Sequence, residues 1–195
     1  MSAAVYHLKK VSIGVKRKYR ISADDGAGHP GELVAYAEEQ LQASDKIVIY
    51  RDEERTEISA TVKESGAGLI AALRAYEVFD AGEKRIGSFG VLMKKSLART
   101  TWEYEQPGLG RLSGTERSVR TARLRRLATF GGGTAGEIAN ALTKYHFDFE
   151  HEGARLFSIE KPKVFDDWYR LTVYADSVDR TLLFALAVTM EARQR

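Results

Sequence analysis

The longest apolar stretch of the chain lies close to its C-terminus. Between Leu182 and Met190, eight of nine residues are apolar, and most of them are good helix formers. A helix that is apolar on every side must be buried. A helix over about residues 178–193 would be roughly 24 Å long, with an apolar part about half that length, which is too short to cross a bilayer. We therefore predict a core helix, capped by Asp176 or Ser177.

Nearly all of the chain before this helix alternates between apolar and polar positions, as half-buried β-strands do. Clear examples are Tyr19–Ala23, Ile58–Val62 and Tyr145–Phe149. Residues 11–15 also alternate, which favours a first edge strand over a loose N-terminal arm. Further strands are expected at residues 47–50, 76–79, 86–90, 101–104, 156–160 and 168–174.

The stretch E32-L-V-A-Y-A-E-E-Q-L41 fits both a strand and a helix, because apolar residues four positions apart would also share a helical face. A faint internal repeat favours the strand. An aromatic-led strand, an acidic glycine turn and a second strand occur at residues 19–36 and again at residues 76–90. The repeat suggests two related β halves around the helix.

A closed or nearly closed antiparallel barrel of about a dozen strands is wide enough to enclose a helix. We therefore predict a mainly β fold, in which a β-barrel surrounds the C-terminal helix. The 195 residues, 44% of them hydrophobic, suffice for one well-filled core, and no linker-like stretch divides them. A single domain over residues 1–195 is expected.

The strand pattern changes near residue 113. S113-G-T-E116 fits a capping box, in which the serine oxygen accepts from a backbone N–H and the glutamate side chain reaches back. We predict a basic helix from about residue 114 to 128, ended by the glycines at 131–133. Its arginines do not form a single stripe, so a solvated helix face is the simpler interpretation.

The composition and the sequence motifs exclude several classes of function. The chain has no cysteine, which excludes disulfides, thiol catalysis and sulfur-bound zinc, and its start lacks the apolar core of a signal peptide. G131-G-G-T-A-G136 satisfies a dinucleotide fingerprint only formally, because it follows a predicted helix instead of a strand. The histidines lack metal-ligand spacing, and His146 on its hairpin is expected to face solvent. We expect a cytoplasmic protein without catalysis, cofactor or metal.

Several segments are similar to those of a known family. They are Y76-E-V-F-D-A-G-E-K-R-I-G87, S96-L-A-R-T-T-W102, D166-D-W-Y-R-L-T-V173 and the D179-R180 pair that opens the apolar helix. Over about residues 19–192 the chain resembles the LURP-one-related and phospholipid-scramblase-like proteins of the tubby C-terminal superfamily. The resemblance implies a twelve-stranded barrel around a central helix. Some tubby-like members bind phosphoinositides through surface Lys and Arg, but neither that site nor a scramblase calcium segment matches here residue by residue.

Basic residues gather in two places, although the formal net charge is only +3. The candidate anion-binding residues are Lys16, Arg17 and Lys18 near the start, and Arg111, Arg117, Arg120, Arg123, Arg125 and Arg126 in the middle. Near an anionic leaflet, each Lys or Arg of a basic segment can contribute about 1 kcal/mol. These residues are the candidates for binding an anionic partner, with a solvated surface as the alternative.

Two functions are compatible with this sequence. The first is a non-enzymatic module that binds anionic phospholipid head groups or associates peripherally with a membrane surface. The alternative is a protein–protein interaction scaffold without a lipid role, which binds a partner through exposed hairpins and unpaired strand edges. Nucleic acid is not expected, because recognition-helix, zinc-finger and base-stacking patterns are absent from the sequence.

Overall fold

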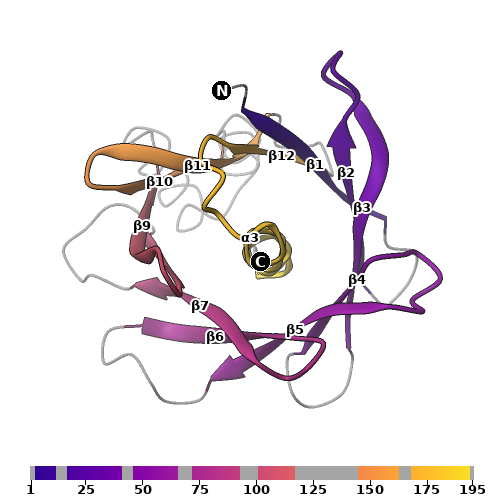
Figure 1. Ribbon diagram of the computed structural model, residues 1–195, viewed down its shortest axis with the longest axis horizontal. Coiled ribbons are helices and arrows are strands. Elements are labelled where there is room, and N and C mark those ends of the chain that lie inside the picture. Colours follow the sequence, from indigo (N-terminus) through magenta and orange to yellow (C-terminus); the bar gives the residue numbers. More distant parts are fainter. Residues whose placement is uncertain are drawn as a thin grey trace, which may run out of the picture.

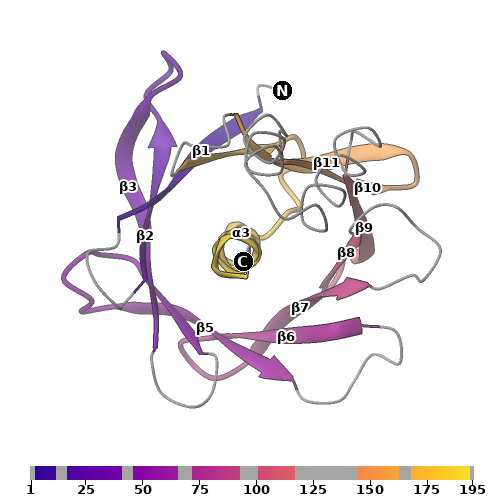
Figure 2. The same cartoon turned by 180° about the vertical axis from the view of Figure 1, so that it is seen from behind.

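The computed structural model describes residues 3–11, 17–40, 46–65, 72–92, 101–116, 145–162 and 168–193. Within these ranges, twelve antiparallel strands form a closed barrel around one helix, α3 (Arg180–Ala192), as Figures 1 and 2 show from opposite ends. The strands are β1 (Ala4–Lys10), β2 (Lys18–Asp24), β3 (Pro30–Glu39), β4 (Ile47–Tyr50), β5 (Ile58–Ser65), β6 (Ala72–Asp80), β7 (Arg85–Leu92), β8 (Thr101–Gln106), β9 (Gly110–Glu116), β10 (Tyr145–His151), β11 (Ala154–Lys161) and β12 (Trp168–Val173). The predicted mainly β barrel with a C-terminal helix is confirmed.

The barrel closes because each strand pairs with its neighbour in sequence and β1 also pairs with β12. Ala4 lies opposite Val173 in that last ladder, so segments near the two ends of the chain lie side by side. The first strand is therefore not an edge strand. It also lies earlier than predicted, because Tyr6 and Leu8 supply its inward positions, and residues 12–16 fall outside the described residues.

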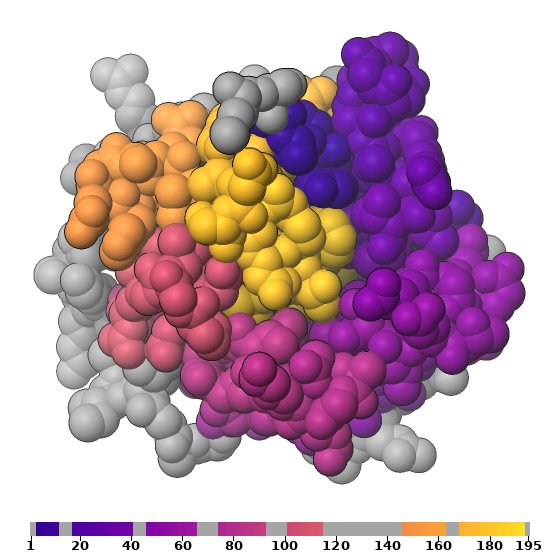
Figure 3. Space-filling model, in the orientation of Figure 1, coloured from indigo at the N-terminus to yellow at the C-terminus, as the bar shows by residue number. Residues whose placement is uncertain are grey.

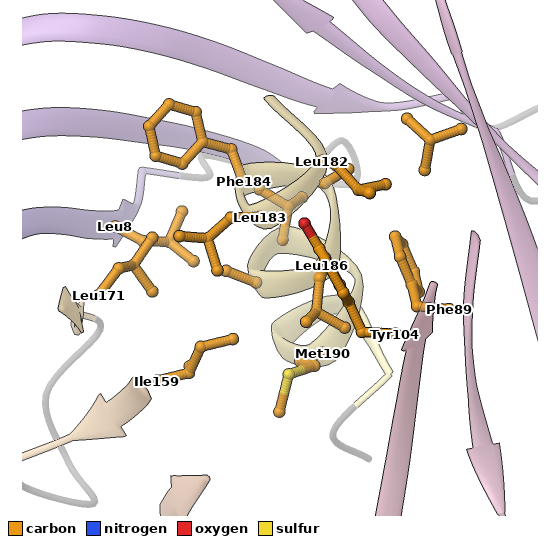
Figure 4. Packing of buried hydrophobic residues seen from close by; sticks show 14 of the residues in the cluster. Leu8, Phe89, Tyr104, Ile159, Leu171, Leu182, Leu183, Phe184, Leu186 and Met190 are labelled. Atoms are coloured by element: carbon orange, nitrogen blue, oxygen red, sulfur yellow. The ribbon is translucent and has the colours of Figure 1, made fainter. Parts of the chain in front are cut away.

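The helix α3 fills the barrel. Ten of its thirteen residues are buried, and in the space-filling view the C-terminal segment occupies the centre of the ring of strands (Figure 3). Leucines of α3 pack against inward-facing side chains from several strands, among them Leu8, Phe89 and Tyr104 (Figure 4). The one buried polar side chain of α3, Thr189, is satisfied because its hydroxyl donates to the carbonyl of Ala185 at 2.8 Å. The interior is thus an apolar core.

The helix begins three residues later than Asp176, at a different cap from the two predicted. The side chain of Asp179 accepts a hydrogen bond from the backbone N–H of Leu182 at 2.9 Å. Gln106 of β8 fixes the preceding segment, since its amide donates to the carbonyl of Ser177 at 2.7 Å and accepts from the N–H of Asp179 at 2.8 Å. The prediction of Asp176 or Ser177 as cap was wrong because a distant strand holds Ser177 outside the helix.

The ambiguous stretch at residues 32–41 lies mostly in β3, so the strand interpretation is confirmed. The predicted capping box at residues 113–116 is wrong, because these residues belong to β9 and pair with both β8 and β10. Sequence alone misses the reason, which is the close approach of Phe149 to Gly114. A Cβ on Gly114 would lie 2.3 Å from Cζ of Phe149. The rest of the predicted basic helix, residues 117–128, lies outside the described residues.

The barrel has two chemically different ends, which we call the Asp179 end and the Arg193 end after the residues that flank α3. Gln106 contacts Ser177 at the Asp179 end, and Lys161 contacts Glu191 at the Arg193 end. Because consecutive strands are antiparallel, the connections alternate between the ends. Those at residues 25–29, 51–57, 81–84, 107–109 and 152–153 lie at the Asp179 end, and those at 11–17, 40–46, 66–71, 93–100, 117–144 and 162–167 begin and end at the Arg193 end.

Substitution of Gly114 by alanine distinguishes the observed strand from the predicted helix. In a helix the change would stabilise the protein by about 1 kcal/mol. Beneath the ring of Phe149 it should instead destabilise by about 1–3 kcal/mol, because the new methyl overpacks the core. Urea denaturation measures the difference, and a second change, Phe149→Leu, should recover part of the loss. A stabilised Gly114→Ala variant would contradict the strand.

Removal of α3 should abolish the fold. Leu182, Leu183, Phe184, Leu186, Val188 and Met190 are all buried, and together they represent roughly 9–18 kcal/mol of gross burial, as much as the net stability of a typical domain. A chain truncated after Ala175 is therefore expected to be insoluble or to lack a cooperative thermal transition by circular dichroism. A cooperative thermal transition of the truncated chain would show that the β-barrel is stable without α3.

Candidate functional site

The described residues include three of the nine basic residues predicted to bind an anion. Arg17 and Lys18 lie at the Arg193 end, where β2 begins, and Arg111 lies near the start of β9 at the Asp179 end. The length of α3 separates the two ends by about 20 Å. The fold therefore does not bring Arg111 together with Arg17. Lys16, Arg117, Arg120, Arg123, Arg125 and Arg126 lie outside the described residues.

Arg111 is an exposed strand residue within an acidic neighbourhood. Its side chain is 54% exposed, and its guanidinium nitrogens lie 3.9 Å from a carboxylate oxygen of Glu103 and 3.5 Å from one of Glu105. Exposed ion pairs of this kind contribute little to stability. The two glutamates also oppose any anion that approaches Arg111, so Arg111 is a poor candidate for the predicted site.

Arg17 is held in a network around the last turn of α3. One guanidinium nitrogen donates to the carbonyl of Ala192 at 2.6 Å and lies 3.2 Å from the carboxylate of Glu39. The same glutamate lies 3.7 Å from the guanidinium of Arg193, the residue that caps the helix. The last carbonyls of a helix have no partner within it and carry partial negative charge, so cations are favourable there. Arg17 therefore stabilises the C-terminal end of α3.

A second carboxylate on the same turn completes this network. Glu191 accepts a hydrogen bond from the hydroxyl of Tyr169 on β12 and lies 3.9 Å from the ammonium of Lys161 on β11. The ammonium also lies 5.1 Å from the centre of the Tyr169 ring. Sequence reasoning missed Glu191, Tyr169 and Lys161, because no local motif joins positions on separate strands to the end of a helix.

Two further tyrosines, Tyr19 of β2 and Tyr76 of β6, are buried at this end. Burial raises the pKa of Tyr19 far above its usual value, and the negative charges of Glu39 and Glu191 raise it further. Burial also raises the pKa of Tyr76, against a smaller lowering by Arg193, whose guanidinium lies 5.8 Å from the ring centre. Both hydroxyls therefore remain protonated and able to donate.

Charge is distributed unevenly between the two sets of connections that join the strands. The six connections that begin and end at the Arg193 end contain thirteen Lys or Arg and four Asp or Glu, a formal charge of +9. The five turns at the Asp179 end, with residues 174–179, contain three Lys or Arg and nine Asp or Glu, a formal charge of −6. The two basic clusters of the sequence flank strand ends on the same side, since β2 begins and β9 ends there. The small net charge of the chain thus conceals an uneven distribution of charge among its connecting segments.

The outer wall carries the histidines in settings that the sequence did not reveal. His146 points away from the core, as predicted, but its side chain is only 13% exposed and lies 3.3 Å from the carboxylate of Asp148. His7 of β1 is 2% exposed, and its Nε2 lies 2.7 Å from the Oδ2 of Asp24, the last residue of β2. Among the described residues, no three His, Asp or Glu side chains are placed to hold a metal ion.

Closure of the barrel contradicts one part of the protein-scaffold hypothesis, which is binding through unpaired strand edges. Each described strand pairs on both sides, so none of them offers an unpaired edge to a partner strand. The exposed hairpins of the Asp179 end remain available for such a partner. Two large apolar side chains there are well exposed, Ile58 at 46% and Tyr174 at 42%.

The pairing of Asp24 with His7 predicts a pH dependence of stability. The hydrogen bond from His7, followed by those from the N–H groups of Gly26 and Gly28, lowers the pKa of Asp24 below its usual 3.8. A lowered carboxyl pKa stabilises the fold above that usual value, and the stabilisation is lost as the pH falls through the lower, folded-state value. Asp24→Asn should therefore lower the urea midpoint at pH 6 and reduce its fall between pH 4 and pH 2. The exposed Asp176→Asn serves as control, and equal acid profiles for wild type and Asp24→Asn would exclude the linkage.

Comparison with known proteins leaves the family open. The sequence matches no known protein family and no curated protein. Among the described residues, there is no helix with the length and hydrophobicity required to cross a membrane. A shared barrel architecture does not establish kinship or function. The resemblance to the tubby C-terminal superfamily therefore stays a prediction.

Proposed function

We propose that this protein is a non-enzymatic module that binds anionic phospholipid head groups through the Arg193 end of its barrel. The observation that carries the proposal is the contrast in charge between two sets of connections, +9 in those that begin and end at the Arg193 end and −6 in those of the Asp179 end. An anionic surface attracts the first end and repels the second. The protein would therefore approach a membrane in one orientation, with α3 pointing its C-terminal end toward the lipid.

Screening by salt allows the basic connections to attract an anionic surface, although the net charge of the chain is small. At physiological salt the Debye length is about 8 Å, whereas the ends of α3 are about 20 Å apart. The acidic turns are thus largely screened from a surface that touches the basic end. Each Lys or Arg held near an anionic leaflet contributes about 1 kcal/mol, so a few of the thirteen suffice for reversible binding.

The packed interior favours a surface ligand over an enclosed one. Inward side chains of the wall contact α3 directly, and a Cβ on Gly87 would lie 2.3 Å from Cδ2 of Leu182. A ligand is therefore expected at an end of the barrel or on its outer wall. Of these surfaces, the Arg193 end has the charge that suits an anionic head group.

The alternative is a protein-interaction scaffold whose acidic hairpins bind a basic partner. The exposed Ile58 and Tyr174 favour it, because both lie at the Asp179 end and would be covered by a partner. Apolar contact resists salt, whereas head-group binding weakens with salt. Partner binding that persists in high salt and is abolished by changes at the Asp179 end would favour the scaffold.

Co-sedimentation with vesicles tests the lipid proposal. Wild type should bind vesicles that contain phosphatidylserine but not neutral vesicles, and binding should weaken between 50 and 300 mM salt. The triple change of Arg120, Arg123 and Arg126 to Ala removes three charges from the connection between β9 and β10, and should weaken binding about a hundredfold, at about 1 kcal/mol per charge.

A matched variant controls for net charge. Changing Arg51, Arg85 and Arg111 to Ala removes the same charge from the Asp179 end, where these side chains are exposed. This variant should bind vesicles as well as wild type does. Equal loss in both variants would mean that net charge alone governs binding, and no binding to any vesicle would refute the lipid function.

A further inference from the structure

The outer face of strand β3 carries a buried carboxylate. Because Ala35 and Ala37 belong to the core, the residues that alternate with them point out of the barrel. These are Tyr36, which is 4% exposed, and Glu38, which is 2% exposed. A glutamate is rarely buried to this extent unless it is paired. Tyr50 of β4 lies directly opposite Tyr36, so a negative charge and two tyrosines share this part of the outer wall.

Arg55, in the turn between β4 and β5, reaches this carboxylate from the solvent side. One guanidinium nitrogen donates to Glu38 at 3.1 Å, while 47% of the Arg55 side chain stays exposed. The hydrogen bond to Glu38 and its negative charge raise the pKa of Arg55, with smaller effects of Tyr36 and Tyr50. Burial and then the charge of Glu38 raise the pKa of both tyrosines. The guanidinium, the carboxylate and the two phenol rings therefore form one interacting group.

The backbone of the turn does not depend on this contact. The carboxylate of Asp52 accepts hydrogen bonds from the backbone N–H groups of Thr56 and Glu57 and from the hydroxyl of Thr56. These bonds fix the turn on both sides of Arg55. The Arg55 side chain can therefore leave Glu38 by rotation about its own bonds, while the turn stays folded.

Departure of Arg55 would leave a carboxylate that attracts another cation, because a buried charge without its partner is unfavourable. Lys18 of β2 lies opposite Glu38 in the sheet, but an ammonium does not supply the planar pair of donors that a guanidinium offers a carboxylate. Aromatic side chains beside the carboxylate also favour a guanidinium, which stacks on them. Arginine is therefore the side chain that this arrangement fits.

We propose that Glu38, Tyr36 and Tyr50 form a binding site for an arginine side chain of a partner protein, and that Arg55 occupies the site as an internal competitor. The guanidinium of the partner displaces Arg55 and donates to Glu38 in its place. The site goes beyond the proposed lipid function, because it recognises a cation and uses none of the basic connections. Failure of either proposal therefore leaves the other intact.

Titration with methylguanidinium tests the site after removal of Arg55. Arg55→Gly suits the test, because the backbone of Arg55 has a φ of 65°, which glycine adopts without strain. Protein labelled with 3-fluorotyrosine should show saturable shifts of the Tyr36 and Tyr50 resonances in its fluorine spectrum. Wild type should bind the probe about tenfold more weakly, since Arg55 competes at high effective concentration. Methylammonium should bind the variant more weakly than methylguanidinium does.

Two variants control for charge and position. Glu38→Gln, added to Arg55→Gly, keeps the shape of the side chain and should abolish saturable binding. Arg51→Ala removes another exposed arginine of the same turn, which pairs with Glu57, and should bind the probe as weakly as wild type does. If the pair of Arg55 and Glu38 only stabilises the turn, methylguanidinium will shift the tyrosine resonances of Arg55→Gly without saturation. That result overturns the proposal.

A more conservative variant covers a failure to fold. If Arg55→Gly lacks a cooperative thermal transition, Arg55→Lys keeps a positive charge on the turn but loses the planar donors. It should bind methylguanidinium more tightly than wild type does, and equal binding by Arg55→Lys and wild type would contradict an internal competitor.

Peptides connect the site to a protein partner. A pentapeptide with one arginine between glycines is compared with the same peptide carrying citrulline, which resembles arginine in shape but has no charge. Only the arginine peptide should compete with methylguanidinium for the variant. Competition by both peptides, or by neither, overturns recognition of a partner's arginine.

Discussion

The structure depends on the burial of a helix that is apolar on all sides. In water such a helix is stable only if protein surrounds it completely. The twelve strands do so by forming a closed ring, which also removes the edge strands that an open sheet would expose. Space inside the ring is limited, and glycines lie where the wall approaches large side chains, as Gly87 does at Leu182 and Gly114 at Phe149. The closed ring, its apolar inward positions and these glycines all serve to bury one apolar helix.

A packed core leaves the polar chemistry to the two ends and the outer wall. Both ends must satisfy the unpaired backbone groups of α3, but they do so differently. Asp179 and the neutral side chain of Gln106 hold its beginning, whereas Arg17, Glu39 and Arg193 surround its end with charge. The connections follow the same division, acidic at one end and basic at the other. The two ends of α3 are therefore held by different chemistry.

The sequence was sufficient to predict the barrel and its central helix, because both depend on patterns that are local in the chain. Alternation marked most strands, and an unbroken apolar run marked α3. The errors concern contacts between distant residues. Ser113–Glu116 has a capping-box pattern, but Phe149 and two neighbouring strands make it a strand. Gln106 selects the helix cap from 73 residues away.

The candidate site was predictable only in outline. Basic clusters were visible in the sequence, but the order and direction of the strands were needed to see that both flank strand ends on the same side of the barrel. Arg17 was predicted as a ligand contact, and its bond to Ala192 spans 175 residues that no motif connects. Glu38 looked like an ordinary outward position, since alternation places its side chain outside the barrel but does not predict its burial.

The pairing of β1 with β12 has a consequence for how the protein is made. The ring cannot close until Val173, the pairing partner of Ala4, has been synthesised. The helix α3 is synthesised after both residues. At about 5–20 residues per second, roughly 9–36 s pass between the synthesis of β1 and that of α3. During this time the inner faces of the strands have no helix to cover them. The wall of the barrel therefore cannot close around its core until its last strand has been made.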